Sequence, residues 1–269
     1  MRADLVPDDL WERVAPLLPP APERRRRHPG RLRVPDRVAL TGVMFVLRTG
    51  VAWRDVPAEA VGCSGVTAWR RLRDWTEAGV WPRLHAALLT ELRRADLLDL
   101  DHCAVDGSHV RALKRGDHVG PSPVDRARPG SKHHLIVDRH GTPLAVTLTG
   151  GKRHDVTQLL PLLDAIPPIR GLRGRPRRKP RHLYADRGYD FDKYRRLLRK
   201  RGIKPMIARR GVAHGSGLGK VRWVVERAFA WLHQFKRLRI RYERRADLHQ
   251  GLLELACSLI CLRRLRTAG

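Results

Sequence analysis

Three carboxylates stand in apolar segments, where a charged side chain needs a compensating partner. Asp106 lies within CAVDGS, Asp186 ends the run HLYAD, and Glu226 lies within RWVVERAFAWL. Burying an unpaired carboxylate is costly, and three converging carboxylates repel one another unless cations lie between them. Carboxylate oxygens are the ligands that Mg²⁺ prefers, and two such ions can support an in-line phosphoryl transfer. The pattern predicts that Asp106, Asp186 and Glu226 are catalytic and bind two magnesium ions, with Mn²⁺ as an alternative.

Other acidic residues fit structural roles. Asp138 also ends an apolar run, but it opens the turn Asp-Arg-His-Gly, where aspartate is a common turn former. Asp155 precedes an apolar helical segment and is expected to cap that helix. Glu226 taken alone would suit a surface salt bridge, because Arg222 and His233 share its helical face. We therefore interpret Asp138 as structural and assign Glu226 to the site only together with the two aspartates.

The charge of the chain predicts its partner. A net charge of +28 in 269 residues, with most of the basic excess after Leu100, implies a polyanion, and double-stranded DNA is the expected one. A membrane partner is disfavoured, because the sequence has no apolar run of the roughly 18 residues that a span needs. The N-terminal segment MRADLVPDDLWERV lacks the apolar core of a signal peptide, so we expect a cytoplasmic, nucleoid-associated protein.

The elements that would position these groups fall into two predicted domains. Residues 1–98 are expected to form a small all-α domain, with helices at 6–18, 35–49, 65–78 and 81–95 and a basic linker at 21–33. The helix at 65–78 carries Arg70, Arg71 and Arg73, and with its neighbour it fits a helix-turn-helix that binds DNA. Arginines on a solvated helix face are an equally good interpretation, and the sequence leaves both open.

Residues 99–269 are predicted to form a second, catalytic domain of the α/β class. Short apolar runs at 102–110, 133–138, 143–149, 182–186 and 203–208 predict strands, and the second and third of them flank a turn and form a hairpin. Helical patterns follow at 155–166, 190–201, 220–238 and 246–265. This order predicts a mixed sheet flanked by helices.

The ordered motifs resemble those of the DDE transposases of bacterial insertion sequences, in particular the combined group of insertion-sequence families four and five. The resemblance covers nearly the whole chain and rests on LWERVAPLLPP, VMFVLRTGVAWRDVP, AVDGSHVRA, HLIVDRHGTPLAVTLTGGKRHD, YADRGYD and VRWVVERAFAWLHQFKRLRIRYER. It implies an RNase H-like catalytic fold, a two-metal site at Asp106, Asp186 and Glu226, and cut-and-paste DNA transposition. In that reaction water cleaves a phosphodiester at the terminal inverted repeats, and the freed 3′-hydroxyl attacks target DNA. Synapsis of two transposon ends suggests a homodimer.

The resemblance has one local departure, in the segment around the glutamate. The family's signature there has a tyrosine, an arginine and a lysine at fixed offsets. Arg222 matches the arginine, whereas Gly219 stands at the tyrosine position and His233 at the lysine position. Arg222 and His233 are therefore expected to contact DNA, and Lys236 or Arg237 is a candidate to replace the missing lysine.

Other function classes remain as alternatives. A non-catalytic DNA-binding protein or an inactive transposase remnant would explain the charge and the helices, but it would not need a complete set of three acids. An RNase H-like nuclease would use the same acids. The N-terminal helical region and the long basic loops favour transposon ends as the substrate, through the family resemblance.

Overall fold

The computed structural model describes residues 4–268 except 22, 24–26, 28–30 and 212–218. The N-terminal region is helical, as expected. Its elements are α1 (Asp8–Val14), η1 (Ala15–Leu17), α2 (Asp36–Thr49), η2 (Trp53–Asp55), α3 (Ala58–Val61), α4 (Gly65–Glu77) and α5 (Val80–Arg94). Much of the predicted basic linker at 21–33 lies outside the described residues.

Glycines and a serine set the boundaries of these helices. Gly50 ends α2 with a φ of 76°, a left-handed conformation that glycine adopts without strain. The Ser64 side chain accepts a hydrogen bond from the Thr67 backbone N–H and so caps the start of α4. Gly65 lies so close to the Trp53 carbonyl that a side chain at this position would collide with it. The turn between α2 and α4 is therefore tightly determined.

The second part of the chain forms a mixed sheet in the order β4-β3-β1-β5-β6. Its main strands are β1 (His102–Ala112), β3 (Pro129–Val137), β4 (Pro143–Gly150), β5 (His182–Ala185) and β6 (Lys204–Ile207). The short strands β2 (Gly120–Pro121) and β7 (Ile240–Arg241) pair with β3 and β1. Strands β1, β3 and β4 are antiparallel neighbours, whereas β5 and β6 run parallel to β1. Three antiparallel strands followed by two parallel ones are the sheet of an RNase H-like fold, so the expected fold class is confirmed.

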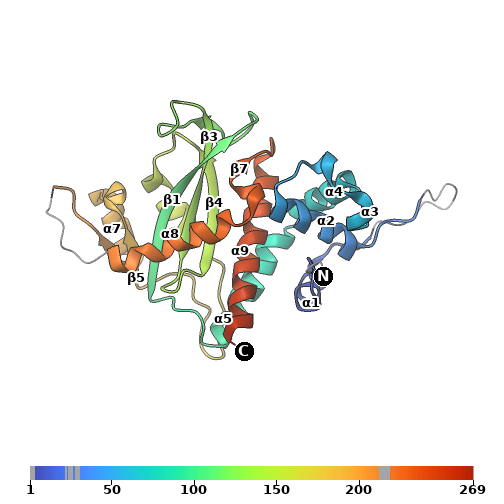
Figure 1. Ribbon diagram of the computed structural model, residues 1–269. Helices are drawn as coiled ribbons and strands as arrows, with labels where there is room; N and C mark the ends of the chain where they lie inside the picture. Colours follow the sequence, from blue (N-terminus) through green and yellow to red (C-terminus); the bar gives the residue numbers. More distant parts are fainter. Residues whose placement is uncertain (1–3, 22, 24–26, 28–30, 212–218, 269) are drawn as a thin grey trace.

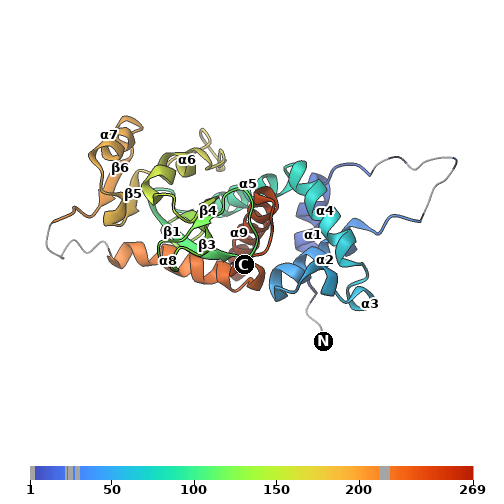
Figure 2. The same cartoon turned by 90° about the horizontal axis from the view of Figure 1, so that it is seen from above.

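Helices cover the sheet on both faces (Figures 1 and 2). Helix α8 (Gly219–His233) packs across β1 and β3, while α6 (Leu159–Asp164) contacts β3 and β4 from the other side. The C-terminal α9 (Ala246–Ala268) packs against β4 and along α5. The helical region therefore joins the sheet through α5 and α9. No helix of the described residues is long and apolar enough to cross a bilayer.

Three local predictions can be compared with the structure. Asp138 is fully buried and accepts hydrogen bonds from the backbone N–H groups of Asp99, His140 and Thr142, which confirms its structural role. The predicted helix at 220–238 is interrupted, because α8 ends at His233 and a separate turn, η5 (Lys236–Leu238), follows. The expected cap at Asp155 was wrong: His154 precedes η3 (Asp155–Gln158), and no side chain caps it.

Candidate active site

The register of the central strands brings Asp106 and Asp186 to the same place. The parallel pairing of β1 and β5 ends with Ala104 opposite Tyr184. Asp106 follows Ala104 by two residues, and Asp186 follows Tyr184 by two residues. Because side chains along a strand alternate between the two faces, both aspartates lie on the same face of the sheet. Two acids that lie 80 positions apart in sequence are therefore neighbours.

The backbone at each aspartate holds its carboxylate in place. Asp106 accepts a hydrogen bond from the Gly107 N–H at 2.8 Å. Asp186 directly follows β5 and accepts the Gly188 N–H, also at 2.8 Å, which caps the short turn η4 (Arg187–Tyr189). Each carboxylate keeps further lone pairs for other partners.

The third acid, Glu226, comes from α8, and Arg222 joins it to the strands. The Nη2 atom of Arg222 lies 3.2 Å from Oε1 of Glu226, one helical turn away, and its Nη1 lies 3.8 Å from Oδ2 of Asp186. Arg222 also lowers the pKa of Asp106 by its charge. One guanidinium thus acts on all three predicted acids.

Burial perturbs Asp106 most strongly. Desolvation, together with the charges of Asp186 and Asp155, raises its pKa to about 6, although the Gly107 hydrogen bond and Arg222 act in the opposite direction. By contrast, the Glu226 side chain is 62% exposed and the Asp186 side chain 41% exposed. The site therefore has one partly buried carboxylate that is short of positive charge and two others that are open to solvent.

Carboxylate oxygens are suitable ligands for a hard cation, but the three acids are not close enough together in this structure to bind one. Among the described residues, no group of three His, Cys, Asp or Glu side chains is close enough together to hold a metal ion. Arg222 instead lies between Asp186 and Glu226. Burial, the main cause of the raised pKa of Asp106, disfavours the charged form of this carboxyl, and a divalent cation beside it would favour that form. The donor set fits Mg²⁺ or Mn²⁺ once the carboxylates draw together.

Sequence reasoning missed two neighbours of Asp106. A Cβ atom on Gly107 would lie 2.8 Å from Oδ1 of Asp155, so Asp155 reaches the centre of the site. Tyr189, in the turn after Asp186, is 1% exposed, and its hydroxyl has no hydrogen-bond partner in the described part of the chain. The motifs GGKRHD and DRGYD contain both residues, but neither motif reveals which strand ends meet in space.

The arginines of α4 differ in their availability for DNA. Arg70 is exposed, as a DNA contact must be. The Arg71 side chain is only 13% exposed, and its Nε lies 3.0 Å from Asp36. Arg73 pairs with Asp74 at 2.7 Å and lies over the Trp69 ring. Of the three, Arg70 best fits the predicted role.

The predicted DNA contacts after Glu226 also differ in their exposure to solvent. Lys236 is exposed, whereas His233 is half-buried beside the Phe229 ring. Arg237 is 3% exposed and donates to Glu243 at 2.7 and 2.9 Å and to the Val51 carbonyl at 3.0 Å. The prediction that Arg237 contacts DNA was wrong, because this side chain ties the helical region to the C-terminal segment.

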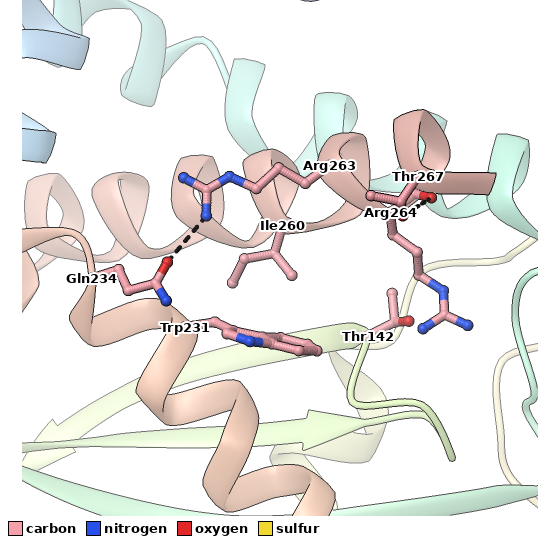
Figure 3. A pocket seen from close by; sticks show the side chains of 7 residues that line it. All are labelled: Thr142, Trp231, Gln234, Ile260, Arg263, Arg264 and Thr267. Atoms are coloured by element: carbon pink, nitrogen blue, oxygen red, sulfur yellow. Dashed lines mark hydrogen bonds between the residues drawn. The ribbon is translucent and has the colours of Figure 1, made fainter. Parts of the chain in front are cut away.

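Two cavities lie apart from the acids. A cleft of about 820 Å³ opens between the helical region and the sheet domain, and its lining residues include Trp53, Trp69, Lys114, Tyr242 and Arg244. Figure 3 shows a smaller cavity of about 290 Å³ between α8, α9 and the hairpin turn, where Arg263 donates to Gln234 at 3.3 Å. None of the three acids lines either of these cavities, and the side chains of Asp186 and Glu226 are exposed to solvent.

Comparison with known families identifies the family of this chain. Residues 98–261 match the family model described as the transposase DDE domain, which is more than half of the chain, and residues 6–85 match the model of a putative transposase of the IS4/5 family. The chain belongs to the IS4/IS5-family DDE transposases. This transposase therefore has its family's helical N-terminal segment followed by the RNase H-like sheet.

Individual relatives support the assignment. The chain is 67% identical over 150 residues to the putative transposase of insertion element IS402 from Burkholderia cepacia, which covers 56% of this chain and 71% of that protein. It is 31% identical over 139 residues to the putative transposase of IS6501 from Brucella ovis, over 49% of this chain and 98% of that protein. The Mos1 strand transfer complex aligns over 92% of this chain and 82% of its own, at 14% identity and a TM-score of 0.32. The order of the strands and the family models, rather than this distant likeness, establish the fold.

Proposed function

We propose that this transposase cleaves DNA at the terminal inverted repeats of an insertion sequence and joins the freed ends to target DNA. Asp106, Asp186 and Glu226 are the proposed catalytic acids, and Mg²⁺ or Mn²⁺ is the proposed cofactor. Bound divalent cations would activate the attacking oxygen and stabilise the leaving oxygen of an in-line phosphoryl transfer.

One observation carries the proposal: a single arginine on α8 lies between carboxylates that come from the sheet and from the helix. Arg222 reaches Asp186 and Glu226, and it acts electrostatically on Asp106. This link between three hard oxygen donors and one cation supports the proposal, in a protein of net charge +28. Phosphodiesters of DNA are attracted to this basic surface, and the acids mark the point where positive charge is still needed.

The acids and Arg222 have different roles in this proposal. Asp106, fixed on the central strand, would hold the cation together with Asp186 and the more exposed Glu226. Arg222 pairs with Asp186 and Glu226 in the metal-free chain, and its paired N–H groups would suit a phosphate oxygen of bound DNA.

The proposed DNA contacts and the proposed homodimer concern the two domains of the chain. Residues 1–98 are proposed as the DNA-binding domain, with Arg70 on α4 towards the DNA, and residues 99–269 as the catalytic domain. Lys236 is proposed as a further backbone contact. A homodimer would hold two transposon ends together for strand transfer, and no membrane partner is proposed.

Strand cleavage on a duplex that carries the element's own ends tests the proposal. Asp106→Asn, Asp186→Asn and Glu226→Gln should each retain end binding in a gel-shift assay and lose Mg²⁺-dependent cleavage. Asp164→Asn is the matched control, because Asp164 also pairs with an arginine, Arg201, but lies on α6 away from the acids. Normal cleavage by all three site variants would favour a different catalytic site, and absence of cleavage by the wild-type chain would favour a non-catalytic DNA-binding protein.

A further inference from the structure

Asp155 lies beside the proposed catalytic acids and is held there by a buried lysine. Its Oδ1 accepts a hydrogen bond from Lys132 Nζ at 3.0 Å and lies 3.7 Å from His134 Nδ1. The Lys132 side chain is 7% exposed and the His134 side chain 1% exposed, whereas the Asp155 side chain is 35% exposed. Two buried groups of β3 thus orient a carboxylate that is still open to solvent.

The approach of Asp155 depends on the absence of a side chain next to Asp106. A Cβ atom on Gly107 would lie 2.8 Å from Oδ1 and 3.2 Å from Cγ of Asp155, closer than real Cβ contacts allow. The turn η3, which begins with Asp155, also packs against η4, which follows Asp186. Asp155 is therefore in contact with the backbone of one proposed metal-binding strand and close to the turn after the other.

Tyr189 provides a second, independent observation at the same place. Its side chain is 1% exposed, and its hydroxyl has no hydrogen-bond partner among the described residues. Burial raises the pKa of this phenol, and the charges of Asp106, Asp155 and Asp186 raise it further, so the side chain lies near these acids. An unpaired buried hydroxyl is costly, and its retention suggests a partner that arrives with the ligand.

The carboxylates of this cluster pair with cations from β3 and from α8. Lys132 pairs with Asp155, and Arg222 pairs with Asp186 and Glu226. Burial lowers the pKa of His134 to about 4, so this imidazole is neutral near neutral pH. Its Nε2 is occupied by the Thr149 hydroxyl at 2.7 Å.

We propose that Asp155 is a fourth carboxylate of the cation site and that the Tyr189 hydroxyl donates a hydrogen bond into the same site. Asp155 would contact the cation directly, whereas Tyr189 is a positioning residue that would orient a carboxylate oxygen or a water of the loaded site. Lys132 of β3 holds Asp155 in this position through its hydrogen bond to Oδ1. This inference rests on the proposed function, because it assumes the cation at Asp106 and Asp186.

Mn²⁺ binding to the full chain without DNA, followed by the electron paramagnetic resonance signal of free Mn²⁺, tests Asp155. We expect Asp155→Asn to weaken Mn²⁺ binding by about tenfold, as loss of a group that orients a metal site commonly does. Asp164→Asn should bind like the wild type. If Asp155→Asn also binds like the wild type while Asp106→Asn loses the ion, the inference is overturned and the proposed function stands. If Asp106→Asn keeps full Mn²⁺ affinity, the proposed function itself fails.

A charge-balanced variant covers the case in which Asp155→Asn does not fold. Lys132→Met combined with Asp155→Asn removes both members of the buried pair, so no unpaired lysine remains. The double variant should fold and show the same loss of Mn²⁺ affinity. A folded double variant with wild-type affinity would overturn the role of Asp155.

Tyr189→Phe separates a positioning role from a structural one. Because the hydroxyl has no hydrogen-bond partner in the part of the chain that the structure describes, its removal should leave the melting temperature of the metal-free protein unchanged or raise it, while Mn²⁺ binding weakens severalfold. Tyr194→Phe, on the neighbouring helix α7 (Asp192–Lys200), should leave the Mn²⁺ affinity unchanged. A lower melting temperature with unchanged Mn²⁺ affinity would show that the Tyr189 hydroxyl only supports the fold.

Discussion

Replacing Asp106 by asparagine removes a charge from a position where the metal-free protein holds it at a cost. Burial and two neighbouring acids raise the pKa of this carboxyl from 3.8 to about 6. Asparagine has nearly the same shape and can keep the hydrogen bond from the Gly107 N–H. We expect Asp106→Asn to stabilise the metal-free protein at alkaline pH, although it abolishes cleavage.

The magnitude follows from the shift in pKa. A shift of about two units corresponds to about 3 kcal/mol, at about 1.4 kcal/mol per unit. Because the folded-state pKa is raised, the stability linked to Asp106 is fully present below the unfolded value of 3.8 and is lost as the pH rises through about 6. Roughly half of the difference between wild type and variant should therefore develop between about pH 5 and pH 8.

Urea unfolding in EDTA at several pH values measures this difference. The free energy of unfolding of Asp106→Asn should exceed that of the wild type by about 3 kcal/mol at pH 8, and the gap should narrow towards pH 5. Glu243→Gln is a control with the opposite sign. Burial opposes ionisation of Glu243, yet the hydrogen bond from His249 and the charge of Arg237 hold its pKa at about 2. The stability that ionised Glu243 contributes is present above pH 4.5, its unfolded-state pKa, and is lost as the pH falls through about 2. Glu243→Gln should therefore destabilise the protein at neutral pH.

A gap between wild type and Asp106→Asn that stays constant from pH 5 to pH 8 would refute this reasoning. So would an Asp106→Asn variant that is less stable than the wild type at pH 8. Either result would mean that the carboxylate is already compensated inside the protein, and that it has no deficit of positive charge for a cation to correct.

The other predictions concern DNA binding, the domain junction and the approach of Asp155. Arg70→Ala should weaken binding to transposon-end DNA, measured by fluorescence anisotropy, and lower the slope of log affinity against log salt concentration by about one. An unchanged slope would mean that Arg70 is a solvent-exposed residue that does not contact DNA. Arg237→Met should cost about 3–5 kcal/mol of unfolding free energy, because it leaves the buried Glu243 without its main cation, while Lys236→Ala should cost little. Equal urea midpoints for the two variants would contradict the structural role of Arg237. Gly107→Ala should displace Asp155 and weaken Mn²⁺ binding in the same titration as Asp155→Asn. Gly120→Ala is the control, because a Cβ atom there would meet its nearest atoms at 3.7 Å, an ordinary contact distance.

Much of the fold could be predicted because the periodicity of the sequence agrees with the structure. The alternating run around Asp106 and the hairpin about the Asp138 turn gave the central strands, and glycines such as Gly50 marked the ends of helices. The acids could be chosen because carboxylates are rare within apolar runs. Their convergence follows from the parallel pairing of β1 with β5, which depends on contacts distant in sequence.

The parts that could not be predicted are those set by tertiary contacts. Arg237 is one of a series of basic residues, and only the fold shows that it is buried against Glu243. Asp155 stands where a helix cap would be ordinary, but the buried Lys132 attracts its carboxylate towards β3. Tyr189 reads as a turn residue, and its unpaired hydroxyl becomes visible only when the turn packs against the sheet.

A crystal structure of the full chain with Mn²⁺ tests the central claim most directly. Anomalous scattering should show Mn²⁺ about 2.1–2.3 Å from carboxylate oxygens of both Asp106 and Asp186, with Arg222 withdrawn from between Asp186 and Glu226. Well-ordered Mn²⁺ bound elsewhere, with the three acids still separated by Arg222, would contradict the account.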